Sequence, residues 1–226
     1  MILSVHIPKT AGVSFRQILA ELYREDILLK YWPMTDARGR VVSQVPGHVR
    51  CIHGHFHPEA LLPEFPRAQL VTWVRDPVER VISSYYHRLR SPDWLHPVDR
   101  ELHARKLSLV EFAALDLMRN EMTRYFGAKQ PGDFAFIGQT ERFESSLDEF
   151  LRRFGFGRIR ARRENCNPGR MAERYPVDDR TRQEIAALNE QDIRLHGKIL
   201  EGHRLDQPHR PAPGLPNPPV LLAPWR

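Results

Sequence analysis

A lysine-containing turn near the start of the chain has the residue types of an anion-binding site. The stretch at 6–16 reads HIPKTAGVSFR, and it joins an apolar run at 2–7 to a segment with apolar residues at helical spacing. A tight turn between a buried strand and a helix points main-chain N–H groups and the positive end of the helix at one spot. Lys9 adds a positive charge there, and Gly12 permits close approach of the backbone. We therefore predict that this turn binds a phosphate-like group.

The order of residues in the turn distinguishes it from a P-loop. A P-loop has four residues between two glycines, followed by Lys and Ser or Thr, whereas Lys9 precedes the only glycine of this turn. Thr10 and Ser14 add hydroxyl donors, and we expect Ser14 to cap the following helix. Taken alone, the turn is equally compatible with an ordinary connection that carries a surface lysine.

A second strand–turn–helix stretch places an arginine in an equivalent position. The run QLVTWV at 69–74 predicts a buried strand, and Arg75 follows it directly. An arginine at the end of a strand suits bidentate contact with a phosphate, and Ser83 lies about two turns into the next helix. The alternative is a structural pairing of Arg75 with Asp76 or Glu79. Two such turns in one sheet favour a ligand with two separated phosphate-like groups.

Three histidines at alternate positions form the third chemical feature. The stretch CIHGHFHPE at 51–59 places His53, His55 and His57 on one face if the strand continues through it. With Cys51 they could form a zinc site, but the spacing is not that of the common zinc motifs. The other interpretations are a general base, the commonest role of histidine near neutral pH, or exposed loop histidines.

The elements that must position these residues alternate between strands and helices. Strands are predicted at 2–7, 49–55, 69–74 and 134–138, and helices at about 14–22, 76–91, 108–127, 141–154 and 179–200. Capping boxes are expected at Asp76–Glu79 and Ser108–Glu111. This alternation predicts an α/β domain with a mainly parallel sheet flanked by helices, in which ligands bind at the carboxyl ends of the strands.

Composition indicates which class of partner and which domain organisation to expect. The net charge of +6 favours anionic partners. Cys51 and Cys166 are too few for a disulfide framework. The apolar runs are too short for a membrane-spanning helix, and we expect no stable membrane insertion, no signal peptide and a cytoplasmic or membrane-peripheral protein. We predict one domain at 1–202 and an extended or disordered proline-rich tail at 203–226.

Three motifs in this order resemble one family of enzymes. IPKTAGVSF at 7–15, HGH at 53–55 and RDPVERVISSYYH at 75–87 are similar to sulfotransferases of the heparan sulfate 2-O-sulfotransferase and uronyl 2-sulfotransferase group. The segments at 119–127, 137–150 and 188–200 fit as well, so the resemblance covers residues 2–200 and leaves out the tail. It implies a P-loop-NTPase-like sulfotransferase architecture.

The resemblance assigns roles to the residues singled out above. It implies that the donor is 3′-phosphoadenosine 5′-phosphosulfate (PAPS), with no metal. Its 5′-phosphosulfate would be held by Lys9, Thr10, Ala11, Gly12, Val13 and Ser14, and its 3′-phosphate by Arg75 and Ser83. His55 would be the catalytic base, with His53 assisting and Lys9 stabilising the leaving group. Arg162 and Arg163 are further candidates for contact with the donor. Val13 stands where the family usually has Thr, so only its backbone amide is expected to contribute.

The implied reaction is transfer of a sulfonate group from PAPS to a hydroxyl of an anionic glycan, for which uronic-acid-containing polymers are the family's usual example. The resemblance leaves oligomerisation open. One alternative is a P-loop-like phosphoryl transferase, but no acidic magnesium ligand follows a strand. The other is a non-enzymatic polyanion-binding module, which accounts for the charge but not for the lysine turn, Arg75 and the histidines together. We therefore expect no nucleic-acid partner.

Overall fold

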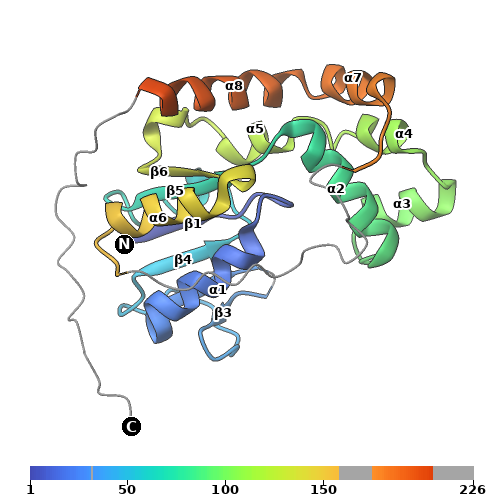
Figure 1. Cartoon of the computed structure of the whole chain (residues 1–226). Coiled ribbons are helices and arrows are strands. Elements are labelled where there is room, and N and C mark those ends of the chain that lie inside the picture. Colours follow the sequence, from blue (N-terminus) through green and yellow to red (C-terminus); the bar gives the residue numbers. More distant parts are fainter. Residues whose placement is uncertain (32, 158–174, 206–226) are drawn as a thin grey trace, which may run out of the picture.

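A six-stranded sheet lies at the centre of the molecule, in the order β3-β2-β4-β1-β5-β6 (Figure 1). The computed structural model describes residues 1–31, 33–157 and 175–205. The strands are β1 (Ile2–Val5), β2 (Ile27–Lys30), β3 (Thr35–Asp36), β4 (Cys51–Gly54), β5 (Gln69–Val74) and β6 (Phe136–Gln139). Every neighbouring pair is parallel except β2 with β3, which is antiparallel. The predicted α/β fold with a mainly parallel sheet is therefore confirmed.

Helices cover both faces of this sheet. They are α1 (Gly12–Tyr23), α2 (Pro77–Arg90), α3 (Pro97–Arg105), α4 (Leu109–Ala114), α5 (Glu121–Phe126), α6 (Phe143–Arg153), α7 (Asp179–Leu188) and α8 (Glu190–Leu205). Short 3₁₀ turns lie at Arg24–Asp26, Pro58–Ala60, Pro131–Asp133 and Thr140–Arg142. No helix in the described ranges has both the length and the apolar sequence needed to cross a bilayer.

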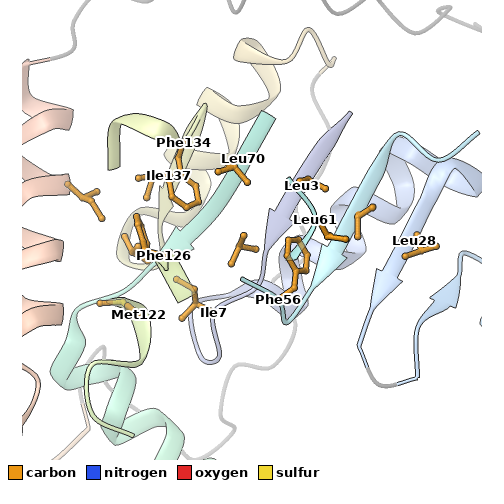
Figure 2. Packing of buried hydrophobic residues seen from close by; sticks show 14 of the residues in the cluster. Leu3, Ile7, Leu28, Phe56, Leu61, Leu70, Met122, Phe126, Phe134 and Ile137 are labelled. Carbon is orange, nitrogen blue, oxygen red and sulfur yellow. The ribbon is translucent and has the colours of Figure 1, made fainter. Parts of the chain in front are cut away.

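The core divides according to the two faces of the strands. On one face, Phe15 of α1 and Phe150 of α6 pack with Trp73 of β5. On the other face, Leu3 and Ile7 share a cluster with Phe126 of α5 and Ile199 of α8, and Figure 2 shows its labelled members lying along the strands and beside α5. A third cluster lies among α2, α3, α4 and α7. Because adjacent strand residues alternate in direction, a strand such as β1 contributes Ile2 to one face and Leu3 to the other.

The four predicted strands are present, and two were not expected. β2 follows the short turn after α1, and β3 pairs with it at the edge of the sheet. The sequence ILLK of β2 is four residues long and follows a helix that is also rich in apolar residues. A run this short carries no period that separates a strand from the end of a helix.

Two long predicted helices are each divided in the structure. The segment at 108–127 forms α4 and α5, because Leu115 is extended and Asn120 adopts a left-handed conformation with φ 51°. The segment at 179–200 forms α7 and α8 with a break at Asn189. The sequence shows continuous apolar spacing in both places, and it is the tertiary contacts of Asn120 and Asn189 with each other's segments that separate the helices.

The expected caps are confirmed in part. Ser108 and Glu111 form the predicted capping box of α4, and the Asp76 side chain accepts from the Glu79 N–H at 3.0 Å. The Glu79 carboxylate does not complete a second box, because it accepts from Arg182 Nη1 at 2.9 Å instead. Ser14 is not the cap of α1. The helix begins at Gly12, so Ser14 lies within its first turn.

The C-terminal boundary of the described chain lies in α8, which ends at Leu205, three residues into the predicted tail. The rest of that tail, at 206–226, lies outside the described residues. Arg162, Arg163 and Cys166 lie outside them as well, while Cys51 is a buried free thiol.

A buried ionic network ties α2 to α5 and α8. The side chain of Arg80 has no solvent exposure, pairs with Glu121 and donates to the Met118 carbonyl at 3.0 Å. Asp192 of α8 accepts from the N–H groups of Met122 and Thr123, which caps the start of α5. Burial raises the pKa of Glu121 even though the Arg80 guanidinium opposes the shift. Removal of Arg80 would therefore leave a buried carboxylate without its cation.

We expect Arg80→Met to lower the free energy of unfolding by about 3–5 kcal/mol, because it leaves Glu121 buried without its charged partner. The measurement is urea unfolding at neutral pH. Arg105→Met is the matched control. It removes the exposed ion pair with Glu101, and pairs of that kind contribute about 1 kcal/mol or less. Equal effects of the two substitutions would contradict a structural role for the buried network.

Candidate active site at the carboxyl edge of the sheet

The carboxyl ends of four neighbouring strands bring the candidate residues to one edge of the sheet. In the order β2-β4-β1-β5, these strands are followed by Tyr31, His55, the turn at 6–11 and Arg75. The parallel register pairs Val5 of β1 with Gly54 of β4 and with Thr72 of β5. The predicted lysine turn therefore lies between the predicted base and the predicted arginine, although these residues are far apart in the sequence.

The lysine turn has an unusual backbone. Lys9 and Ala11 both have positive φ angles, 67° and 64°. Non-glycine residues seldom adopt this conformation, and it costs about 1–3 kcal/mol per residue, so it persists where the surroundings impose it. Alternation of left- and right-handed residues turns successive N–H groups toward one side, which makes an anion-binding concavity. The first intrahelical bond of α1 is Phe15 N–H to the Ala11 carbonyl, so the amides at 12–14 lie before it.

The side chains of the turn are not all available to a ligand. The Thr10 hydroxyl is fully buried and donates to the Ile7 carbonyl at 2.8 Å, so it closes the turn from within. Gly12 packs against the ring of His6, and a Cβ at this position would lie 1.8 Å from His6 Cδ2. The close approach that requires glycine is therefore to a histidine ring of the protein itself. Ser14 is buried in the first turn of α1.

Lys9 lies in a positive environment. Burial lowers the pKa of its ammonium group to about 8, and the nearby charges of Arg75, Arg90 and Arg88 contribute to the shift. No carboxylate of the described residues pairs with Lys9 by a salt bridge. In the absence of ligand, keeping the Lys9 ammonium charged in this environment costs free energy. A bound anion would offset that cost.

Arg75 connects the two predicted anion-binding turns. Its side chain is 8% exposed, and Nη1 donates to the Lys9 carbonyl at 3.2 Å. Its Nη2 lies 3.9 Å from Glu79, so the structural pairing considered from the sequence exists but is long. Ser83 lies on α2 and is buried, at 6% exposure. The structure therefore brings Arg75 against the lysine turn, with Ser83 two turns along the helix that starts beside it.

His55 has the geometry of a general base. Its Nδ1 lies 2.7 Å from the main-chain carbonyl of His6. A carbonyl oxygen can only accept, so Nδ1 carries the proton and Nε2 presents a lone pair. The residue is exposed, while the groups around its inner edge desolvate the ring and lower its pKa. His55 is therefore neutral near pH 7 and open to a substrate.

His53 and His57 have different surroundings. His53 is 1% exposed and its Nδ1 lies 2.8 Å from Ser4 Oγ. Burial, with the charges of His55 and Arg16, lowers the pKa of His53 to about 3. The His57 ring instead stacks on Tyr125 at 5.5 Å. The condition for a shared face of the three histidines is not met, because β4 ends at Gly54.

Two residues of the site were not singled out from the sequence. His6 stacks on His53 and His55 at centroid distances of 5.1 and 4.4 Å, and its Nδ1 lies 2.6 Å from the hydroxyl of Tyr31. His6 belongs to the quoted turn, and its place at the end of the first strand was a usable signal. Tyr31 follows β2, the strand that sequence analysis missed, so no signal was available for it.

A pocket of about 220 Å³ lies near His55, although His55 itself does not line it. Its lining residues are His57, His96, Leu117, Met118, Glu121, Arg124 and Tyr125. Tyr125 lies between the pocket and His55, because its ring is 6.0 Å from that of His55. A larger hollow of about 440 Å³ lies at the edge of the sheet near β3 and contains none of the candidate residues. The smaller pocket reaches the candidate site through Tyr125.

The structure also tests the zinc interpretation of the histidines. Among the described residues, no group of three or more His, Cys, Asp or Glu side chains is placed to hold a metal ion. Cys51 lies in the core with Phe15 and Trp73 rather than with His55.

Comparisons with known proteins agree with this architecture. The family model described as "Sulfotransferase family" matches residues 1–198. Among solved structures, the crystal structure of a sulfotransferase from Alicyclobacillus acidocaldarius is similar, with a TM-score of 0.51 and 17% sequence identity. The alignment covers 88% of this chain and 95% of that chain, and at this identity it shows a shared fold. No curated protein sequence matches the chain.

We expect Lys9 to titrate near pH 8 in the ligand-free protein, so that it is charged below this pH and neutral above it. Its ¹³Cε resonance, assigned with Lys9→Gln, measures this directly. Arg90→Gln should raise the pKa of Lys9 because it removes a neighbouring positive charge. Arg105→Gln should leave the pKa unchanged, because Arg105 is not among the charges that shift it. Titration of Lys9 at the ordinary lysine value would contradict the burial and charge crowding described above.

Proposed function

Because the chain belongs to the sulfotransferase family, we propose that it transfers a sulfonate group from PAPS to a hydroxyl of a glycan, with His55 as the general base. The observation that carries this proposal is the placement of His55, with Nε2 free, beside the strained lysine turn. A base that faces an anion-binding turn is the arrangement that in-line group transfer requires.

The donor would occupy both anion-binding turns. PAPS is the general donor of the family, and it carries two separated anionic groups. The 5′-phosphosulfate would lie on the turn at 9–14. There Lys9 supplies the charge, Ala11, Gly12, Val13 and Ser14 supply main-chain amides, and the internal bond of Thr10 fixes the shape. The 3′-phosphate would lie near Arg75, which precedes α2, and Ser83, two turns into that helix. Arg75 would also help to fix the turn that binds the other end of the donor, because its Nη1 donates to the Lys9 carbonyl.

The reaction follows from these positions. The acceptor oxygen attacks sulfur as its proton passes to Nε2 of His55. The bond between sulfur and the bridging oxygen breaks, and 3′-phosphoadenosine 5′-phosphate leaves with the electron pair. Lys9, the amides of the turn and the positive end of α1 stabilise the charge that develops on this leaving group. Because these groups supply the positive charge, we propose that the transfer proceeds without a metal ion.

His53 would assist without touching the substrate. It is buried and its pKa is lowered to about 3, so it stays neutral at the pH of the reaction. Because the His53 ring is neutral, it neither attracts the anionic donor nor repels the Lys9 ammonium. The hydrogen bond between His53 Nδ1 and Ser4 Oγ fixes the ring of this β4 residue against β1.

The acceptor would approach through the pocket beside Tyr125. The rings of Tyr125 and His57 stack on each other with an interplanar angle of 12°, and a sugar ring would pack on an outer face of this pair. The lining holds Arg124, whose guanidinium donates to the carbonyls of Asp116, Leu117 and Arg119, and the Glu121 carboxylate, so the proposal of an anionic acceptor such as a glycan with uronic acids rests on the family resemblance and the net charge of the chain. Membership of the narrower 2-O-sulfotransferase group rests on the three motifs in their order, of which HGH is the most telling, and we propose it on that ground.

Donor binding can be tested separately from transfer. Saturation with 3′-phosphoadenosine 5′-phosphate at about 100 times its Kd should stabilise the fold by about 2.7 kcal/mol, which raises Tm by about 5–10 °C for a chain of this size. Lys9→Ala should abolish most of this shift, while His48→Ala, at the amino-terminal edge of the sheet, should keep it. Absence of any shift in the wild-type protein would contradict the proposed donor.

The base can be tested by a single substitution. His55→Ala should lower kcat by about 10²–10⁴-fold, the usual contribution of a placed general base. The Tm shift with 3′-phosphoadenosine 5′-phosphate should be retained, because His55 does not hold the donor. The rate is measured as transfer of radiolabelled sulfonate from PAPS to acidic polysaccharides. The pKa of His55 is lowered, so activity should hold down to its ordinary value of about 6.5 and fall only at more acid pH. Near-normal turnover in His55→Ala would exclude this residue as the base.

A further inference from the structure

His6 lies at the centre of a stack of three histidine rings in the candidate site. Its ring is 4.4 Å from that of His55, with an interplanar angle of 27°, and 5.1 Å from that of His53, with an angle of 20°. His6 is 7% exposed, so its ring lies behind His55 and out of reach of a substrate. The proposed reaction gives this buried and titratable side chain no role.

Two neighbours fix the orientation of the His6 ring. On one side, Nδ1 lies 2.6 Å from the hydroxyl of Tyr31. On the other side, the ring packs so closely on Gly12 that a Cβ there would lie 1.8 Å from Cδ2 and 2.1 Å from Nε2. The ring therefore cannot turn without losing a short hydrogen bond or striking the backbone of α1.

The backbone of His6 is fixed as well. Its N–H donates to the Gly54 carbonyl at 2.8 Å, which continues the pairing of β1 with β4. Its carbonyl accepts from Nδ1 of His55 at 2.7 Å. The N–H of His55 donates to the Lys30 carbonyl at 3.1 Å, and a Cβ at Gly54 would lie only 2.1 Å from that oxygen. Strands β2, β4 and β1 thus hold His55 from three directions.

We propose that His6 is a positioning residue for His55: its ring, locked by Tyr31 and Gly12, holds the His55 ring flat so that Nδ1 stays on the His6 carbonyl and Nε2 faces the acceptor. The proposal rests on the proposed function only in that His55 is the base. The carbonyl alone does not fix a ring that can rotate about two bonds, whereas a stacked ring beneath it removes that freedom. The edge of Tyr31 meets His55 as well, at 4.9 Å.

Because of this packing, Gly12 affects His55 as well as the proposed donor turn. A side chain at position 12 would displace the His6 ring and would reach His55 through it. The same glycine belongs to the proposed donor turn, so the donor site and the base share one close contact. The orientation of the base is thereby linked to the conformation of the turn that would hold the donor.

The tautomer of His55 tests the proposal without any need for turnover. Long-range ¹H–¹⁵N correlation spectra of protein labelled with ¹⁵N-histidine distinguish a ring protonated at Nδ1 from one protonated at Nε2, and His55→Gln assigns the signals. Wild-type His55 should show the Nδ1–H form alone. His6→Ala and Tyr31→Phe should each add a substantial Nε2–H population, because the first removes the stacked ring and the second removes the hydrogen bond that fixes it. His48→Ala is the matched control and should change nothing.

The kinetic readout separates positioning from a general loss of structure. His6→Ala should lower kcat by about 10–100-fold, the size expected when a catalytic group is displaced by about 1 Å, while KM for PAPS changes by less than about twofold. Tyr31→Phe, which keeps the His6 ring and removes only its hydrogen bond, should lose less of kcat than His6→Ala. If His6→Ala does not fold, Tyr31→Phe carries the test, because it removes one oxygen atom.

A single Nδ1–H tautomer in both His6→Ala and Tyr31→Phe would overturn the proposal, and so would wild-type kcat in His6→Ala. If the wild-type protein transfers no sulfonate, the proposed function fails, but the tautomer comparison still decides whether His6 positions His55.

Discussion

The parallel pairing of β1 with β4 on one side and β5 on the other is the constraint on which the site depends. This register places His6 beside His55 and the Lys9 turn beside Arg75, although the sequence separates these residues by 49 and 66 positions. The carboxyl ends of parallel strands meet at one edge, so three chemically distinct groups converge without any long loop. A slip of one residue in β4 would turn His55 to the other face of the sheet and remove the proposed base from the site.

Several features at the carboxyl edge of the sheet cost the ligand-free protein free energy. Lys9 and Ala11 hold left-handed conformations, Lys9 lies among arginines with its pKa lowered, and neutral histidines are buried against one another. Features of this kind cluster where a ligand is bound or a reaction is catalysed. The stability that tolerates them comes from elsewhere: apolar clusters on both faces of the sheet, and the buried network through Arg80 that anchors α2. The order of the site is thus maintained by parts of the molecule that take no part in it.

The sequence predicted the frame of the fold and most of the candidate site. Buried strands with clear ends, such as 69–74, were identifiable because turn residues flank them. Lys9, Arg75 and His55 stood out because each follows a strand. The short strand at 27–30 was missed, and with it Tyr31, because four apolar residues show no period. The breaks at Asn120 and Asn189 depend on hydrogen bonds between distant segments. The structure also changed the interpretation of two residues of the turn that were expected to serve a ligand. Thr10 donates a hydrogen bond within the turn, and Gly12 packs on His6.

The central claim is that the lysine turn, Arg75 and His55 form one site for a nucleotide that carries two phosphates. A crystal structure of the complex with 3′-phosphoadenosine 5′-phosphate tests it most directly. Our account predicts the 5′-phosphate on the amides at 9–14 and the Lys9 ammonium, the 3′-phosphate at Arg75 and Ser83, and Nε2 of His55 facing the open side of the 5′-phosphate. A nucleotide bound at another surface, or bound in this turn with His55 directed away from it, would contradict the account.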